Sequence, residues 1–209
     1  MERHSTAKRA LSVAGLAGLI SLAAVMPASA HVGAGSVDTF SRGFLHPLSG
    51  LDHILAMVAV GLYAANLGGR ALWLVPSAFI GTMLIGGLLG YYRWPLPMVE
   101  AGIALSVIVM GMAIALGVRL PTIAAMALVG VFAVFHGHAH GNEGAGLGIA
   151  FLPYAAGFVA ATAVLHVTGL ALGAAFDRLG TTQSSAVNKF AGSAGMIAGI
   201  SLLTGWLAA

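Results

Sequence analysis

Six long apolar stretches with short polar connections constrain this chain more than any other feature of its sequence. Each is close to or longer than the roughly 20 residues that a helix needs to cross the hydrocarbon core of a bilayer. Backbone polar groups in hydrocarbon must be paired within the protein, which favours helices. The pattern predicts spanning helices at about 51–68, 71–90, 98–117, 121–139, 149–176 and 188–207.

The composition points to the same fold class. Of the 209 residues, 59% are apolar and 7% are charged, whereas a soluble domain carries about 25% charged residues. We therefore expect an all-α membrane protein, a bundle of six transmembrane helices in a lipid bilayer, which could also form a homo-oligomer. The sequence contains no basic patch of the kind that binds nucleic acid, so we expect no nucleic-acid partner. The chain has no Cys, so a metal would have to be held by His, carboxylate, carbonyl or water.

Residues 1–30 have the pattern of a signal peptide. Arg3, Lys8 and Arg9 form a positive segment, an apolar stretch follows, and residues 28–30 form an Ala-x-Ala cleavage pattern. The alternative is a retained first transmembrane helix. Cleavage after Ala30 would leave residues 31–209 as a six-span transmembrane domain with His31 at its N-terminus.

The cationic loops predict how the bundle is oriented. If residue 31 lies outside, the loops with Arg70, Arg119, Arg178 and Lys189 lie inside, and those with Arg42 and Arg93 lie outside. Four against two agrees with the enrichment of cations on the cytoplasmic side. In a bacterium this places the chain in the inner membrane, with both mature termini in the periplasm.

A polar cluster lies at the end of the fourth apolar stretch. His136, His138, His140 and Glu143 fall within eight residues. Polar groups are costly in hydrocarbon, so such a concentration suggests a function. On a helix, His136, His140 and Glu143 share one face, whereas His138 points away and could be a gate or a supporting residue. Imidazole and carboxylate are ligands that a borderline divalent metal accepts. Gly137 and Gly141 are expected to loosen the helix here and free carbonyl groups.

A second polar motif precedes the first span. It contains His46, Asp52 and His53, and His46 would share a face with His53 if the helix is continuous past Pro47. Asp52 has two interpretations. With Ser49 it forms a capping-box pattern, or it orients His53 by accepting a hydrogen bond.

Two further polar residues lie in or beside predicted spans. Glu100 begins the third span, where it either interacts with the helix dipole or belongs to a cation path. His166 lies in the middle of the fifth span, where it either forms an interhelical hydrogen bond, for example to Ser or Thr, or has a function. Most of these polar residues fall in the outer half, as residues of a single site would.

The two motifs resemble those of a known family. His46-x5-Asp52-His53 and Phe135-His136-Gly137-x-Ala139-His140-Gly141-x-Glu143 are similar to the motifs of the HupE/UreJ family of hydrogenase and urease accessory membrane proteins. The resemblance extends over the mature chain and implies a nickel permease, with cobalt as the substrate of similar proteins. It implies that Ni²⁺ or Co²⁺ is the transported substrate and that no permanent cofactor is needed. It also implies which residues bind the metal. The matching positions are His46, Asp52, His53, His136, His140 and Glu143; His31, Glu100, His138 and His166 are further candidates.

Other classes of function remain as alternatives at this point. An intramembrane metal-dependent hydrolase would use similar ligands, but no His-Glu-x-x-His pattern occurs. A third alternative is a membrane scaffold for a metalloenzyme complex. We expect transport rather than catalysis, and we expect the two motifs to meet near the outer face.

The predicted N-terminal His31 leads to a test. Its free amine and imidazole could together capture a divalent ion, whereas the alternative is a disordered stub. We expect His31→Ala to raise the half-saturating metal concentration for uptake with little change in the maximal rate, because a capture arm matters most when the ion is scarce. An unchanged half-saturating concentration would contradict this role, and N-terminal sequencing checks the cleavage site.

Overall fold

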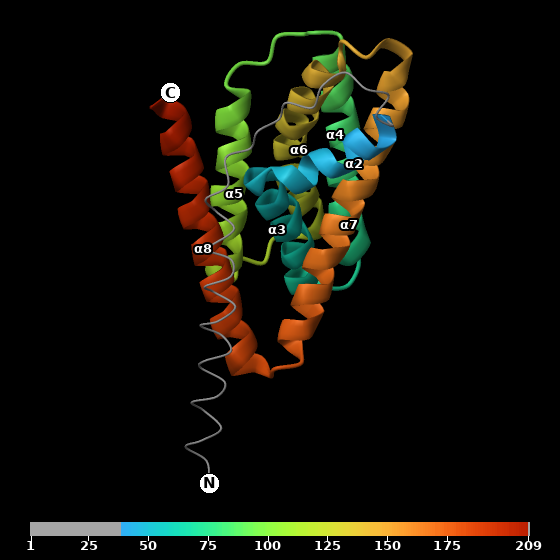
Figure 1. Ribbon diagram of the computed structural model, residues 1–209. Helices are drawn as coiled ribbons and strands as arrows, with labels where there is room; N and C mark the ends of the chain where they lie inside the picture. Colours follow the sequence, from blue (N-terminus) through green and yellow to red (C-terminus); the bar gives the residue numbers. More distant parts are fainter. Residues whose placement is uncertain (1–38, 209) are drawn as a thin grey trace. The chain divides into compact units, whose positions relative to one another are not determined.

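The computed structural model describes residues 39–208, and every regular element within them is helical. The predicted signal peptide and His31 lie outside these residues. In chain order the elements are α2 (Thr39–Ser49), α3 (Leu51–Leu67), α4 (Ala71–Tyr91), α5 (Val99–Ala115), α6 (Thr122–Gly144), the short 3₁₀ helix η2 (Gly148–Ala150), α7 (Phe151–Asp177) and α8 (Thr181–Leu207). The predicted all-α class is confirmed (Figure 1).

Each predicted apolar stretch corresponds to one helix, but the helices differ in their ability to cross a bilayer. Four of them, α4, α6, α7 and α8, are long and apolar enough to do so. Helices α2 and α3 meet this condition only as a pair, which is bent by 82°, and α5 is a shorter apolar helix of 17 residues. The chain is thus a multi-pass membrane protein with four or five candidate spans, and the predicted number of six stays a prediction.

The outer surface of the bundle fits a lipid environment. Large apolar side chains are exposed along the helices, among them Leu116, Ile123 and Leu152, which are each more than 70% exposed. An extended apolar surface of this kind marks contact with a membrane or a partner. The buried core of the described residues is also apolar, apart from a few polar side chains that include five histidines.

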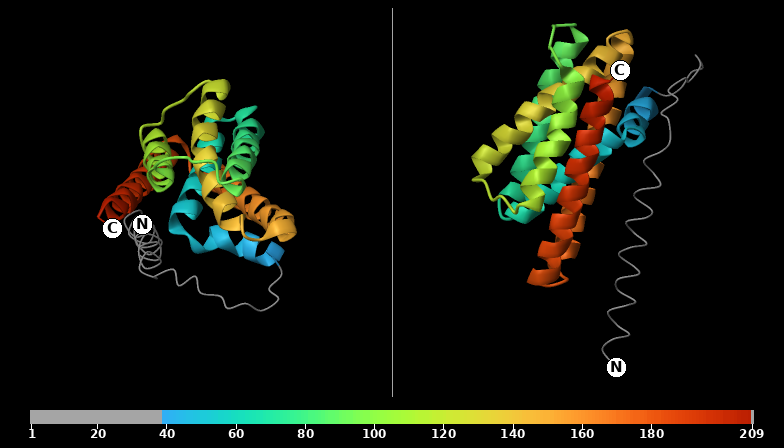
Figure 2. Two further views of the ribbon diagram at one scale, coloured as in Figure 1. Left: turned by 90° about the horizontal axis from the view of Figure 1, so that it is seen from above. Right: turned by 90° about the vertical axis from the view of Figure 1, so that its left-hand side faces the viewer.

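Four close helix pairs organise the bundle. Helix α4 packs along α6, α5 packs along α8, and both α2 and α3 pack against α7. Figure 2 shows these pairs end-on and from the side. The packing of α6 along α4 positions the second polar motif. The packing of α2 and α3 against α7 positions the first motif.

Glycines allow the backbones of these pairs to approach closely. A side chain at Gly137 would overlap the carbonyl oxygen of Met83, and one at Gly141 would overlap the carbonyl oxygen of Gly87. The prediction that these two glycines loosen the helix is wrong, because α6 continues as an α-helix to Gly144. Their lack of a side chain instead permits the close crossing of α4 and α6.

This packing predicts a contrast between glycines of the same helix pair. We expect Gly137→Ala or Gly141→Ala to lower the free energy of unfolding by about 1–3 kcal/mol or more, because the new methyl group meets rigid backbone. Gly81→Ala is the matched control, since Gly81 lies in α4 and faces open space. Thermal unfolding of the detergent-solubilised protein measures the difference, and equal stability of all three variants would contradict this packing role.

Candidate metal centre

The break between α2 and α3 places the first motif. Gly50 separates the two helices with an extended backbone, and a side chain at this position would crowd Asp52 and His53. The helix is therefore not continuous from His46 to His53, but it breaks at Gly50 and not at Pro47, which lies inside α2. The break lets His46 approach His53 from a separate helix, with 6.1 Å between their ring centroids.

Asp52 orients His53 and does not form a capping box. The Ser49 hydroxyl donates to the carbonyl oxygen of His46 at 2.7 Å, and α3 has no side-chain cap. The carboxylate of Asp52 lies 2.7 Å from Nδ1 of His53. Of the two interpretations of Asp52, the structure thus favours the one in which it fixes a neighbouring imidazole.

His53 in turn contacts His140 of the second motif. Their Nε2 atoms lie 2.6 Å apart in a buried hydrogen bond that joins α3 to α6. The expectation that the two motifs meet in space is confirmed by this contact. If Nδ1 of His53 donates to Asp52, its Nε2 carries the lone pair and accepts from the Nε2–H of His140. Nδ1 of His140 then carries a lone pair as well.

Nδ1 of His140 is one of three ligand atoms that lie close together. We call this group the tripod: Nε2 of His46, Nδ1 of His140 and a carboxylate oxygen of Glu143. These atoms all lie within 4.8 Å of one another. The Oε2 atom of Glu143 lies 3.2 Å from Nε2 of His46 and 3.4 Å from Nδ1 of His140. The tripod residues come from α2 and α6, so it forms only in the folded bundle.

Exposure changes steadily across the tripod. The side chain of Glu143 is 51% exposed, that of His46 is 33% exposed and that of His140 is 5% exposed. An ion arriving from water would therefore meet the carboxylate first and the buried imidazole last. The order of exposure gives the cluster an entrance and an interior.

His136 is not part of the tripod and lies deeper in the bundle. It is fully buried, and its Nδ1 donates to the carbonyl oxygen of Phe132 at 3.0 Å. Its Nε2 therefore carries a lone pair, and this atom has no hydrogen-bond partner among the described residues. The ring centroid of His136 is 5.5 Å from that of His53.

Three of the other candidates lie apart from the tripod. His138 turns away, as predicted, and its Nε2 donates to the carbonyl oxygen of Trp94 at 2.7 Å. Glu100 is exposed in the first turn of α5. His166 is buried in α7 against Phe79. Within residues 39–208 it makes no hydrogen bond to Ser or Thr, so the interhelical bond suggested for it is absent there.

Sequence reasoning missed two aromatic residues of α7. The Tyr154 hydroxyl donates to Glu143 at 3.4 Å, and the ring of Phe158 lies 4.0 Å from that of His140. Their spacing of four residues places them on one face of a helix. That spacing was visible in the sequence, but nothing in it showed that this face of α7 lies beside the second motif.

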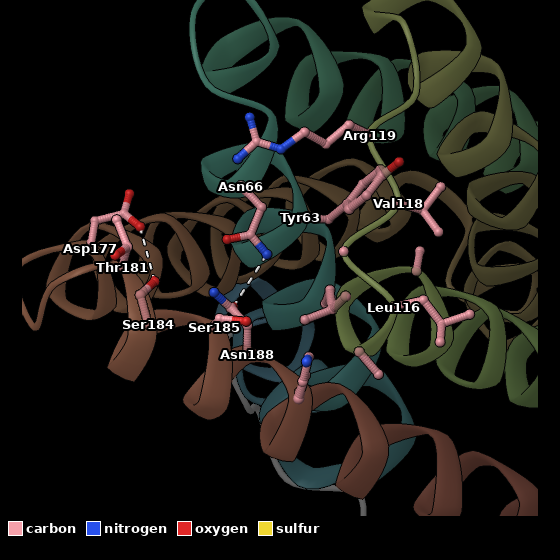
Figure 3. Close-up of a pocket in the computed structure, with 15 residues that line it drawn as sticks. Tyr63, Asn66, Leu116, Val118, Arg119, Asp177, Thr181, Ser184, Ser185 and Asn188 are labelled. Atoms are coloured by element: carbon pink, nitrogen blue, oxygen red, sulfur yellow. Dashed lines mark hydrogen bonds between the residues drawn. The ribbon is translucent and has the colours of Figure 1, made fainter.

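A cavity of about 480 Å³ lies at the other end of α3 from the histidines. Its polar lining includes Tyr63, Asn66, Asp177, Ser184 and Asn188 (Figure 3). Asn66 donates to Asn188 at 3.2 Å, and Ser184 donates to Asp177 at 3.2 Å. Arg119 and Lys189 also line the cavity, which makes it a polar mouth of mixed charge rather than a concentrated cation site.

The fold and the cluster together define a class of protein. The chain is a multi-pass helical membrane protein in which two imidazoles and a carboxylate, graded from exposed to buried, converge on one cluster. Such nitrogen and oxygen ligands suit Ni²⁺, Co²⁺ and Zn²⁺ better than Mg²⁺ or Ca²⁺.

Comparison with known proteins identifies the family within this class. Residues 19–202 match the family model described as HupE / UreJ protein. The chain is 48% identical over 188 residues to "Protein HupE" of Rhizobium leguminosarum bv. viciae, which covers 90% of this chain and 95% of the relative. The chain belongs to the HupE / UreJ family, which confirms the resemblance found in the two motifs. No solved structure matches it.

The geometry predicts an order of effects on Ni²⁺ binding by the purified protein. We expect His140→Ala to weaken binding by about 100-fold or more, because it removes a tripod atom. Asp52→Asn should weaken it by about 10–100-fold, the usual effect of losing a group that orients a ligand.

His138→Ala is the control for this series, because its ring bonds to Trp94, and we expect its affinity to stay within about twofold of the parent. Isothermal titration calorimetry in detergent measures all three variants. A stronger effect of His138→Ala than of His140→Ala would contradict the assignment of the tripod.

Proposed function

We propose that this chain is a nickel permease that carries Ni²⁺ from the periplasm to the cytoplasm for the maturation of a nickel enzyme such as a hydrogenase or a urease. The observation that carries the proposal is the tripod, in which Glu143 is half exposed and His140 is buried. Family membership supports it. Ni²⁺ is the substrate in this proposal, and no permanent cofactor is required.

In the proposed mechanism, Glu143 and His46 take the hydrated ion at the periplasmic mouth. Glu100, which is exposed in the first turn of α5, adds a carboxylate to the outer cation path. The neutral Nδ1 of His140 then replaces part of the hydration shell, while Asp52 and His53 hold the imidazole in the required tautomer. The tripod itself has a single carboxylate, with neutral imidazoles as its other ligands, which favours weak binding and release.

The polar cavity beside Tyr63 and Asn66 would serve as the cytoplasmic mouth. This assignment uses the predicted orientation, in which α5 and the α2–α3 pair complete six spans, the chain lies in the inner membrane and both mature termini are periplasmic. The sequence has no nucleotide-binding motif, so the proposal assigns the driving force to the ion gradient or to coupled proton movement.

Cobalt is the second candidate substrate. The tripod contains only imidazole and carboxylate ligands, and the intrinsic affinities of such ligands separate Ni²⁺ from Co²⁺ only weakly. We propose no catalytic activity, because no observation favours the hydrolase over transport. Competition of Co²⁺ with labelled Ni²⁺ for uptake measures the preference directly.

Uptake of labelled nickel by expressing cells tests the function. We expect His136→Ala, His140→Ala and Asp52→Ala each to reduce uptake to background, because each disrupts the line of imidazoles that leads inward from Glu143. His138→Ala should have a milder effect. Immunoblots of membranes control for abundance, and normal uptake by the first three variants at normal abundance would contradict the permease mechanism and favour a scaffold.

A further inference from the structure

His166 is a buried imidazole whose presence is not explained by a contribution to stability. Its side chain lies in the middle of α7 and is 1% exposed, and neither ring nitrogen has a hydrogen-bond partner among the described residues. A buried donor or acceptor left unpaired costs about 1–3 kcal/mol. A polar group retained in hydrocarbon at such a cost indicates a function.

His166 ends a line of side chains that begins at the tripod. Tyr154, Phe158, Thr162 and His166 follow one another at intervals of four residues on α7, so each lies about one turn from the next along a stripe that winds slowly around the helix. The Tyr154 hydroxyl bonds to Glu143, and the ring of Phe158 lies against His140. Twelve residues of helix span about 18 Å, so this line leads from the exposed carboxylate deep into the bundle.

The inner end of the line is chemically suited to hold a cation for a short time. The Thr162 hydroxyl, one turn from His166, donates to the thioether sulfur of Met83 at 3.8 Å, and both residues are buried. Phe79, one turn from Met83, contacts His166 and His136, with ring centroids 5.1 and 5.7 Å apart. A single aromatic ring thus contacts two imidazoles with unpaired nitrogens. Among the described residues, neither nitrogen of His166 has a hydrogen-bond partner, and Nε2 of His136 has none.

We infer that His166 is a second coordination station for the transported ion, inside the membrane and beyond His136, with Thr162 and Met83 as neighbouring oxygen and sulfur donors. The inference rests on the proposed function, because it gives the next step for an ion that leaves the tripod. The station contains no carboxylate, so it binds the ion more weakly than the tripod does and passes it on. The Phe79 ring lies against both histidines and is the side chain that must move as the ion passes.

A cysteine reporter tests this station directly, because the natural chain has no Cys. We expect purified His166→Cys protein to develop a thiolate-to-nickel charge-transfer band in the near ultraviolet when Ni²⁺ is added. Thr168→Cys is the matched control, since Thr168 is exposed on the same helix and bonds to the carbonyl oxygen of Val164; it should give no band. A His166→Cys protein that binds Ni²⁺ without the band would overturn the inference.

Transport in proteoliposomes supplies the second readout. We expect His166→Phe, which fills the space but removes the nitrogens, to lower the rate of Ni²⁺ entry at least tenfold while Ni²⁺ affinity at the tripod stays within twofold. His166→Cys, which keeps a ligand atom, should retain a larger share of the rate. Equal rates for the parent and both variants would overturn the station.

The two proposals fail in different ways. If the parent protein carries no Ni²⁺ and does not bind it at the tripod, the permease function fails. If the parent carries Ni²⁺ and His166→Phe carries it equally well, only the station fails. If His166→Phe loses tripod binding together with transport, His166 has a structural role and the station is likewise rejected.

Discussion

The hydrogen bond between His53 and His140 is the interaction on which the candidate site depends. It joins the two polar motifs, 87 residues apart in the sequence, through a 2.6 Å contact between Nε2 atoms in the buried interior. Asp52 fixes the tautomer of His53, and His53 in turn fixes that of His140. The result is a lone pair on Nδ1 of His140 beside His46 and Glu143, and this set of imidazole and carboxylate ligands suits a borderline divalent cation.

The polar interior differs from one that serves stability alone. Within residues 39–208, five buried side-chain atoms lack hydrogen-bond partners, and four of them are histidine nitrogens, on His136, His140 and His166. Folded proteins usually pair such atoms, because each unpaired one costs about 1–3 kcal/mol. Close glycine packing of α4 against α6 and of α3 against α7 holds these imidazoles in place. In the proposed mechanism, the transported ion is the partner that they lack.

Much of this arrangement could be predicted from the sequence, because it depends on local periodicity. The apolar stretches predicted the positions of the helices. The spacing of His136, His140 and Glu143 predicted that their side chains lie on the same face of α6. The bend at Gly50 was not predicted, since Pro47 is the more conspicuous helix breaker, and yet Pro47 lies inside α2. The role of Gly137 and Gly141 was mistaken because a glycine pattern does not distinguish a loosened helix from a close crossing. The contributions of Tyr154 and Phe158 depend on which helix lies beside α6, and one sequence does not contain that information.

X-ray absorption spectroscopy of the nickel-loaded protein shows directly whether the tripod holds the ion. We expect a nitrogen and oxygen shell with the outer-shell scattering of two imidazoles, one each from His46 and His140. His140→Ala should remove one of the two imidazole contributions from the ion that still binds. A shell of oxygen atoms alone, unchanged by His140→Ala, would describe a hydrated ion at the surface and would contradict the tripod as the nickel site.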